Sequence, residues 1–341
     1  MPENTVLRFD ANGRFRVLMV SDFHAGAQFN PMLKTGLEAL LEHVKPDFVM
    51  IGGDQCLTLD TVEETRDYLA DIIDPIIKRG LPWGAVFGNH DRECGLPVEE
   101  EIKAYTLLPG CLAEAGPEDI HGIGNYRIPV LAHGGDEPRL YLWALDSNRY
   151  IKDYIPMFGL DKDTRFVLPD HFSDGSPDGQ PLFDQIRWYY NGSEEIERAC
   201  GRKVPGVMFM HTPLMEYLQI LRNPEECGAI GSLRSHIGAA EISSGLFMAA
   251  LERGDIRGVF FGHEHLCDIQ GQYAGITMAC DAALGFNMSG HDDLRGGRVI
   301  DLFEEGTMQT YMVHLMELMG KAAMRDPDYF EGGCKYFIRK L

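Results

Sequence analysis

Three stretches near the start of the chain decide its fold: FRVLMVSDFH (residues 15–24), FVMIGGDQ (48–55) and WGAVFGNHD (83–91). Each opens with bulky or β-branched apolar residues, a pattern typical of a strand buried on both faces. Each closes with a cluster of polar residues, several of them types that turn the chain. We therefore predict buried strands at 15–20, 48–51 and 83–87.

The segments between these strands have apolar residues at helical spacing. Residues 32–44 (MLKTGLEALLEHV) predict one helix, and residues 62–79 predict another. Because strands and helices alternate, the strands are expected to run parallel and to be joined by right-handed crossovers. Sheets of this kind build their sites beyond the carboxyl ends of the strands, which is where the polar clusters fall.

The rest of the chain continues this pattern less regularly. We expect further strands at 126–130, 140–145, 204–210, 257–261, 276–280 and 297–303. We expect helices at 181–190, 193–199 and 241–253, and a helical tail over 307–341 whose helix covers 307–320. Residues 151–182 are rich in Asp, Gly and Pro and predict a long surface loop or insertion.

The composition argues against several classes of protein. The 341 residues include 31 Lys and Arg against 52 Asp and Glu, a formal net charge of −21, without a run of four basic residues. Nucleic-acid backbones need basic partners, so we expect no nucleic-acid ligand. No apolar stretch of 18 residues predicts a membrane span. The opening MPENT lacks the pattern of a secretion signal, and none of the eight cysteines forms a CxxC pair, so we expect a cytoplasmic protein with reduced thiols.

Five polar clusters follow five predicted strands: Asp22 with His24, Asp54, Asn89 with His90 and Asp91, His211, and His263 with His265. Each alone has an ordinary explanation as a helix cap, a turn or a hydrogen-bonded core histidine. Independent caps would include Ser and Thr at least as often as Asp. The repeated choice of Asp, His and Asn is instead the choice of residues that bind divalent metals.

The spacing within the clusters supports convergence on one point. Asp22 and His24 are two residues apart, as are His263 and His265, and on an extended backbone such pairs point to the same side. A glycine precedes Asp54, Asn89 and His263, where the backbone can turn and come close to a ligand. The sequence therefore predicts a metal site.

The order D-x-H, G-G-D, G-N-H-D, H and G-H-x-H resembles the calcineurin-like metallophosphoesterases. The blocks here are SDFH, IGGDQ, FGNHD, FMHTP and FFGHEH, and they span residues 22–265. Flanking pieces, among them LDSN at 145–148 and HTPLMEY at 211–217, are similar to the purple-acid-phosphatase-like branch. The chain has GDQCL where true purple acid phosphatases have GDxxY with a tyrosine ligand, so the resemblance implies the non-purple type. MACDAALGFNMSG at 278–290 departs from the Gly-rich, aromatic segment usual after G-H-x-H.

The resemblance implies an α/β fold, a four-layer αββα sandwich of two mixed β-sheets with helices outside. We expect a single domain over 1–341 with its core at about 15–303, because ligands from residue 22 to residue 265 must meet in one site.

The resemblance also implies two divalent metal ions, Mn, Fe or Zn. One would be held by Asp22, His24, Asp54 and His265, and the other by Asp54, Asn89, His211 and His263, with Asp54 shared between them. A hydroxide bridging the metals would attack a phosphomonoester or a small phosphodiester. His90 would be the acid or phosphate contact, and Asp91 would orient it. The other seven histidines match no motif position, and Glu264 is expected to face outward.

Two alternatives stay open. One is a nuclease, because some double-strand-break repair nucleases share D-x-H and G-N-H-D, although the net charge of −21 disfavours it. The other is a non-catalytic binding module on the same fold, which typically lacks some ligands or the acid histidine. The leading hypothesis is an enzyme that acts on a small phosphorylated substrate.

Overall fold

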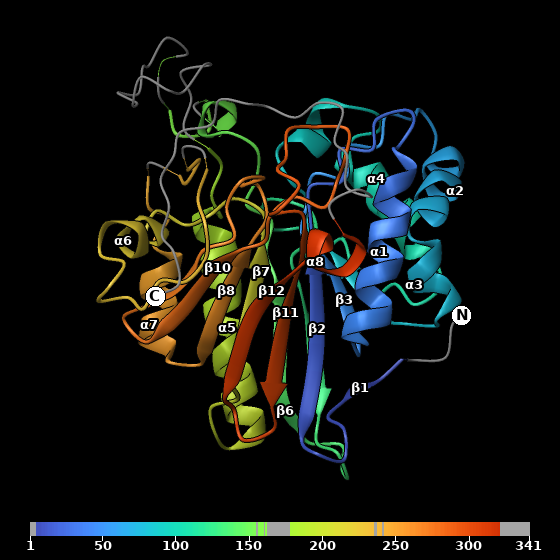
Figure 1. The fold of residues 1–341 in the computed structure, drawn as a ribbon. Coiled ribbons are helices and arrows are strands. Elements are labelled where there is room, and N and C mark those ends of the chain that lie inside the picture. Colours follow the sequence, from blue (N-terminus) through green and yellow to red (C-terminus); the bar gives the residue numbers. More distant parts are fainter. Residues whose placement is uncertain are drawn as a thin grey trace.

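Two mixed β-sheets pack face to face and are flanked by helices, which confirms the predicted αββα sandwich (Figure 1). The computed structural model describes residues 5–154, 156–159, 161, 178–234, 237–240 and 242–320. The five-stranded sheet has the order β12 (Met308–His314), β11 (Gly296–Phe303), β2 (Arg14–Val20), β3 (Phe48–Ile51) and β4 (Trp83–Ala85). The seven-stranded sheet has the order β1 (Leu7–Arg8), β5 (Tyr126–Leu131), β6 (Pro138–Ala144), β7 (Gly206–Met210), β8 (Ile256–Phe261), β10 (Ile276–Cys280) and β9 (Gln270–Tyr273).

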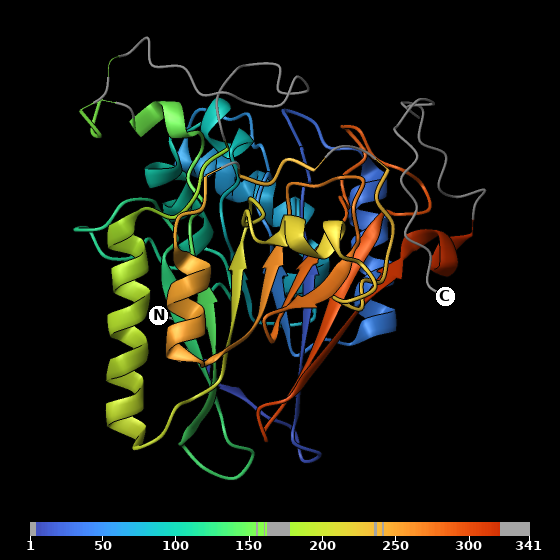
Figure 2. The same cartoon turned by 90° about the vertical axis from the view of Figure 1, so that its left-hand side faces the viewer.

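The helices form the two outer layers, as Figures 1 and 2 show from two sides. The five-stranded sheet is covered by α1 (Pro31–Val44), α2 (Val62–Ile72), α3 (Asp74–Lys78), α4 (Val98–Thr106) and the short α8 (Leu315–Met319). The seven-stranded sheet is covered by α5 (Phe183–Cys200), α6 (Tyr217–Arg222) and α7 (Leu246–Arg253). Among the described residues, no helix has the length and apolar character needed to cross a membrane.

The central strands are apolar on both faces because each face is covered. In β7, Val207 and Phe209 join the core that fills the space between the sheets, whereas Met208 and Met210 pack under the helices of the seven-stranded sheet. This alternation follows from the two-residue period of a strand. It explains why the sequence shows a continuous apolar run at 204–210.

The site-bearing strands run parallel and end at one edge of the sandwich. Strand β2 pairs in parallel with β3, and β3 with β4, in the five-stranded sheet. Strand β7 pairs in parallel with β8 in the other sheet. The five polar clusters of the sequence follow the ends of these five strands, so both sheets contribute to one edge.

Four predicted helices were wrong in part, for three different reasons. The predicted helix over 62–79 divides into α2 and α3, because Pro75 has no N–H with which to continue the ladder. The two predicted helices at 181–190 and 193–199 are one continuous helix, α5.

The third error concerns the tail. The helix predicted at 307–320 is mostly strand β12, which pairs antiparallel with β11 through a hairpin at Gly306 (φ +92°). Only the five residues of α8 are helical there. The rest of the predicted tail, 321–341, lies outside the described residues, as do 162–177 of the predicted insertion.

Candidate metal centre

Four of the predicted ligands lie together around one point. Donor atoms of Asp22, His24, Asp54 and His265 all lie within 4.8 Å of one another. His24 Nε2 is 2.9 Å from His265 Nε2 and 3.6 Å from Asp54 Oδ2, and His265 Nε2 is 3.4 Å from Asp22 Oδ1. Two carboxylates and two imidazoles therefore face one small space, as the donors of a divalent metal do.

A second group shares Asp54 with the first. Donor atoms of Asp54, His211 and His263 also lie within 4.8 Å of one another, and His211 Nε2 is 3.2 Å from Asp54 Oδ2. Asn89 Oδ1 is 3.0 Å from His263 Nδ1, so the amide borders the same group. The structure therefore brings all seven predicted ligands together, in the two sets that the resemblance implies.

Two buried atoms of these groups fit a bound cation. Asp22 Oδ1 and His211 Nε2 are inaccessible to water and have no hydrogen-bond partner among the described residues. A buried polar atom without a partner is costly, and metal coordination would remove that cost. The donor set of carboxylate, imidazole and amide groups suits Mn, Fe or Zn.

Hydrogen bonds to the backbone orient two of the imidazoles. His211 Nδ1 donates to the carbonyl oxygen of Gly52 at 2.9 Å, and His265 Nδ1 donates to that of Ser289 at 2.8 Å. These bonds place a proton on Nδ1, so that in the neutral form of each ring Nε2, beside Asp54 or Asp22, carries the lone pair that a metal ion could take. No sequence pattern indicates either carbonyl partner.

The loops that carry the ligands have an unusual backbone. Five non-glycine residues at the site have positive φ: Asp22 (54°), His24 (43°), Asp54 (54°), Cys56 (52°) and His263 (69°). Such conformations are sparsely populated and cluster at functional sites. The extended backbone assumed for the Asp22/His24 and His263/His265 pairs is therefore wrong. Each pair reaches the site through a kink.

Glycines allow the loops to approach closely. A Cβ on Gly53 would lie 2.3 Å from His211 Nδ1, and a Cβ on Gly88 would lie 2.1 Å from Asp54 Oδ1. A Cβ on Gly262 would lie 2.6 Å from the carbonyl oxygen of Gly52. Each contact is too short for any side chain, which explains the glycines before Asp54, Asn89 and His263.

Protonated histidines balance the carboxylates when no cation is bound. Burial would raise the pKa of Asp54, but His211 and His24 outweigh burial and hold it far below its usual range. Burial would lower the pKa of His211, but Asp54 raises it to about 9. Burial also opposes protonation of His263, yet the Asp178 carboxylate raises the pKa of that ring to about 10. His24 differs, because burial lowers its pKa to about 4.

Asp91 has a different role from the one predicted. Its carboxylate accepts three backbone N–H bonds, from Gly88 at 2.7 Å, Cys56 at 2.7 Å and Asp54 at 3.0 Å. It thereby ties the loop after β3 to the loop after β4. Burial and the Asp54 charge nevertheless raise the pKa of Asp91 to about 6. Asp91 supports the loops and does not orient His90, so that prediction was wrong.

Glu93 is the partner of His90. His90 Nδ1 lies 2.5 Å from Glu93 Oε2, and the His90 side chain is 40% exposed, at the open side of the site. Arg149 Nη2 donates to Glu93 Oε1 at 2.9 Å, and Tyr150 Oη lies 3.3 Å from the same oxygen. Burial would raise the pKa of Glu93, but His90 and Arg149 together lower it.

Two further acidic residues, which sequence reasoning missed, lie at the centre. Asp178 Oδ2 lies 3.6 Å from His263 Nε2, and both side chains are largely buried. Glu264 was predicted to face outward, but it is buried and accepts a hydrogen bond from the Gly238 N–H. Burial raises the pKa of Glu264 to about 7. The prediction for Glu264 failed because the kink at His263 breaks strand alternation.

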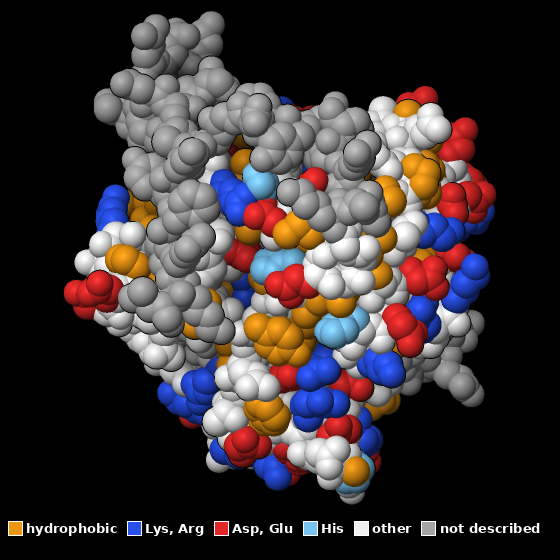
Figure 3. Space-filling view, in the orientation of Figure 1, with side chains coloured by type: hydrophobic (Ala, Val, Ile, Leu, Met, Phe, Trp, Pro, Cys, Tyr) orange, Lys and Arg blue, Asp and Glu red, His pale blue; other side chains and the backbone are white. Residues whose placement is uncertain are grey.

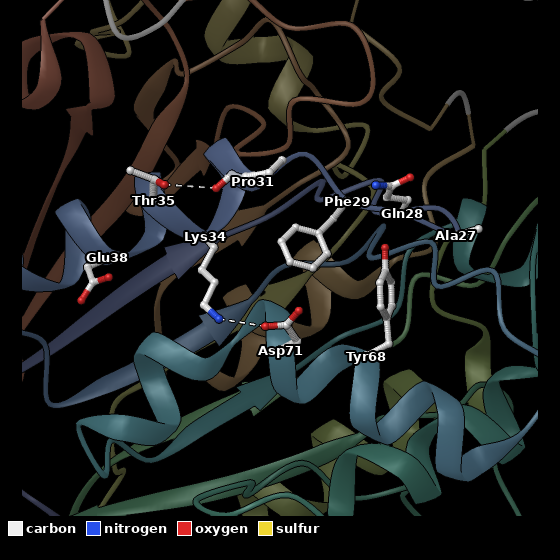
Figure 4. Close-up of a pocket in the computed structure, with 9 residues that line it drawn as sticks. All are labelled: Ala27, Gln28, Phe29, Pro31, Lys34, Thr35, Glu38, Tyr68 and Asp71. Atoms are coloured by element: carbon white, nitrogen blue, oxygen red, sulfur yellow. Dashed lines mark hydrogen bonds and ion pairs between the residues drawn. The ribbon is translucent and has the colours of Figure 1, made fainter.

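A separate hollow of about 630 Å³ lies between the start of α1 and α2 (Figure 4). Lys34 Nζ donates to Asp71 across it at 2.8 Å, and the Phe29 ring packs edge-on against Tyr68. None of the predicted site residues lines this hollow. Lys34 pairs with Asp71 and Glu38 pairs with Arg79, so the hollow offers no donor set comparable to the metal centre.

The fold and this donor set define a family. The calcineurin-like phosphoesterase family model matches residues 15–267, and the chain belongs to that family. This confirms the resemblance inferred from the motifs.

The chain is also similar to named plant and yeast proteins. Two Arabidopsis thaliana proteins, probable inactive purple acid phosphatases 14 and 29, are 28% and 25% identical to this chain. Their alignments cover 89% and 83% of this chain and 78% and 75% of the relatives. Phosphatase DCR2 of Saccharomyces cerevisiae is 24% identical over 75% of this chain and 45% of its own length.

Solved structures share the fold. A dimetal phosphatase from Danio rerio superposes with a TM-score of 0.53 at 11% identity, over 88% of this chain and 96% of that one. GAP50, an anchor in the inner membrane complex of Plasmodium, gives a TM-score of 0.51 at 9% identity, over 90% of this chain and 87% of that one. At such identities the likeness concerns the fold alone.

Proposed function

We propose that this protein is a metal-dependent phosphoesterase that hydrolyses a phosphomonoester or a small phosphodiester. The observation that carries the proposal is the pair of donor groups that share Asp54, one with four side chains and one with three plus the adjacent Asn89. Two metal ions held there would supply Lewis-acid charge to the phosphoryl oxygens and acidify a bound water.

The chain's own residues then divide the remaining work. The metal ligands would be the seven residues of the two donor groups: Asp22, His24, Asp54, Asn89, His211, His263 and His265. His90 stands at the open side with Nδ1 held by Glu93, so in its doubly protonated form Nε2–H is left for the phosphate or the leaving oxygen. Glu93 is a positioning residue, itself fixed by Arg149. His24 lies beside His90, with ring centroids 5.6 Å apart, so the acid borders the first donor group.

A small substrate is favoured over a nucleic acid. The net charge is −21, and on the face shown in Figure 3 the Lys and Arg side chains are interspersed with acidic ones. A polyanion needs a continuous basic surface, and the described part of this face offers none. We retain the proposal of a cytoplasmic enzyme with reduced thiols; the seven cysteines in the described ranges are unpaired.

The test is turnover of p-nitrophenyl phosphate and bis-p-nitrophenyl phosphate by protein stripped of metal and reloaded with Mn, Fe or Zn. Asp54→Asn should lose both bound metal and turnover. His90→Asn should keep its metal but lose about 10²–10⁴-fold in kcat. Glu93→Gln should keep its metal and lose about tenfold. His43→Asn, an exposed histidine at the end of α1, is the matched control and should leave both unchanged.

Two outcomes would replace the proposal. Two of the relatives are named probable inactive phosphatases, which favours a non-catalytic binding module as the alternative. Protein that binds metal with the expected dependence on Asp54, but turns over neither ester with any of the three metals, would establish that alternative. Metal-dependent cleavage of plasmid DNA exceeding that of the nitrophenyl esters would favour a nuclease.

A further inference from the structure

An apolar cavity of about 350 Å³ is lined by residues that follow Tyr150 and Asp178 in the sequence, and these two residues contact Asn89 and His263 of the candidate metal centre. Its apolar walls are Ile151, Phe158, Pro181, Leu182, Phe183 and Ile242. Among the residues that the structure describes, no charged side chain lines it. Its size falls within the range of small-molecule pockets, about 300–1,000 Å³.

Two segments connect this cavity to the metal ligands. Residue Tyr150 forms a β-bridge with Asp178, and the Gly179 N–H donates to the Arg149 carbonyl at 2.9 Å. On the metal side of this bridge, Asn89 Nδ2 donates to Tyr150 Oη at 3.3 Å. Asp178 also faces the centre, 3.6 Å from His263.

The cavity lies on the continuation of the same two segments. Ile151 follows Tyr150, and the pair Gln180 and Pro181 follows Asp178 after one glycine. Gln180 Nε2 also contacts the Pro213 carbonyl at 3.4 Å, in the loop that begins with His211. The chain therefore passes directly from residues that contact the metal ligands to residues that line the cavity.

Large apolar side chains around the cavity are left in contact with water. Phe183 is 76% exposed, Phe158 44% and Ile242 40%. Single exposed apolar residues are ordinary, but three around one cavity beside a polar site are typical of a ligand groove. Contact with an apolar ligand would remove that surface from water.

One buried polar atom adds a second feature. Gln180 lines the cavity and is 2% exposed, and its Oε1 has no hydrogen-bond partner within the described ranges. Its amide nitrogen is already used, because Nε2 donates to the Gly179 and Pro213 carbonyls. The remaining Oε1 can only accept a hydrogen bond, so a ligand that satisfies it must carry a donor.

We propose that this cavity binds the alcohol part of the substrate, and that this part is an apolar alkyl or aromatic group with one hydrogen-bond donor. The inference rests on the proposed phosphoesterase function. It adds a substrate class: esters of hydrophobic alcohols or phenols, in place of sugar phosphates or nucleotides, whose many hydroxyl groups would find few partners on these walls.

The first test compares ethyl phosphate with octyl phosphate, whose leaving alcohols have similar acidity. The metal-loaded wild type should favour octyl phosphate by about tenfold or more in kcat/KM. Phe183→Ser and Ile242→Ser should each reduce this preference several-fold and leave ethyl phosphate turnover unchanged. Met248→Ser is the matched control, because Met248 is 62% exposed on α7 and outside the cavity. Equal use of both esters by the wild type would overturn the inference.

The second test separates this inference from the proposed function. Binding of 1-naphthol to the metal-free protein, followed by its fluorescence, needs no turnover. Phe183→Ser should weaken naphthol binding, and Met248→Ser should not. 1-Naphthol should also bind about two- to tenfold more tightly than naphthalene, because its hydroxyl can donate to Gln180 Oε1. Ester turnover without naphthol binding would refute the assignment of the cavity and leave the proposed phosphoesterase function standing. Binding without turnover of any ester would sink the phosphoesterase and, with it, the cavity's role as a substrate subsite.

Discussion

A single methyl group at Gly88 should empty the metal centre at a modest cost in stability. The Cβ of Gly88→Ala would lie 2.1 Å from Asp54 Oδ1 and 2.7 Å from His211 Nε2, against 3.4 Å for an ordinary contact. The carboxylate, or the loop that holds it, must therefore retreat by about 1.3 Å, the difference between those distances. Gly88 does not have a positive φ, so alanine adds no backbone strain there.

The expected loss follows from the tolerance of metal coordination. Ligand distances vary by only about 0.2 Å around their preferred values, so a shift of this size removes Asp54 from both donor groups at once. Changes to groups that merely orient ligands cost about 10–100-fold in metal affinity, and loss of the shared ligand should cost more than 100-fold. The overpacked site should also lower the free energy of unfolding by about 1–3 kcal/mol.

Manganese affinity by calorimetry and urea denaturation of the metal-free protein measure these two effects. Gly134→Ala is the control, because a Cβ there has nothing within 4 Å and its φ is not positive. That variant should match the wild type in both measurements. A Gly88→Ala protein that binds manganese as tightly as the wild type would refute the argument that Asp54 is the shared ligand in this geometry.

Three further outcomes are expected. Asp91→Asn should lower the free energy of unfolding by about 1–3 kcal/mol, because the amide NH₂ would replace one carboxylate oxygen and face either the Cys56 N–H or those of Gly88 and Asp54; an unchanged urea midpoint would contradict this. Glu101→Gln should stabilise the protein above about pH 4.5, because burial, then the Asp91 charge, raises the pKa of Glu101 well above that value in the folded state. In the folded wild type Glu101 holds a proton that the unfolded chain releases, so this residue makes the wild type less stable as the pH rises, whereas glutamine has no such effect. If the melting temperatures of the wild type and the variant change in parallel from pH 4 to 9, this explanation is wrong. Metal loading at pH 7 should release protons from His211 and His263, whose pKa values are raised to about 9 and 10, and calorimetric enthalpies that do not depend on the buffer would argue against this.

The features that the sequence predicts well are local ones. An apolar run and the polar cluster directly after it occupy one short stretch of chain, so strand and ligand are read together at 15–24, 48–55 and 83–91. The order of the clusters then identifies the family, and the family supplies the division of the donors between two groups. This reasoning does not depend on predicting which distant segments of the chain contact each other.

The errors arise where a distant contact or a backbone kink decides the outcome. Asp178 reaches His263 across 85 residues of sequence, and no local pattern marks it. Strand β12 was mistaken for helix because its apolar residues fit either period, and its pairing with β11 decides the structure. Glu93 could have been found: residues His90–Glu93 form a 3₁₀ turn, in which side chains three apart lie one above the other.

The kinked loops of the centre are held by backbone bonds that do not involve metal. The N–H groups of Asp22 and His24 donate to the carbonyls of Gly53 and Asp54 at 2.9 and 3.0 Å, so the two ligand loops continue the pairing of β2 and β3. The Asp91 carboxylate accepts hydrogen bonds from the N–H of Asp54, in the second of these loops, and from the N–H of Gly88, at the start of the third ligand loop. Residues with unfavourable φ cost of order 1–3 kcal/mol each and persist only where the surroundings fix them, as here. The strain is therefore carried by the sandwich itself, which holds the donors in position and so reduces the reorganisation that cation binding requires. It follows that removing metal should leave the loops in place, whereas cutting the Asp91 connection should loosen them even when metal is abundant.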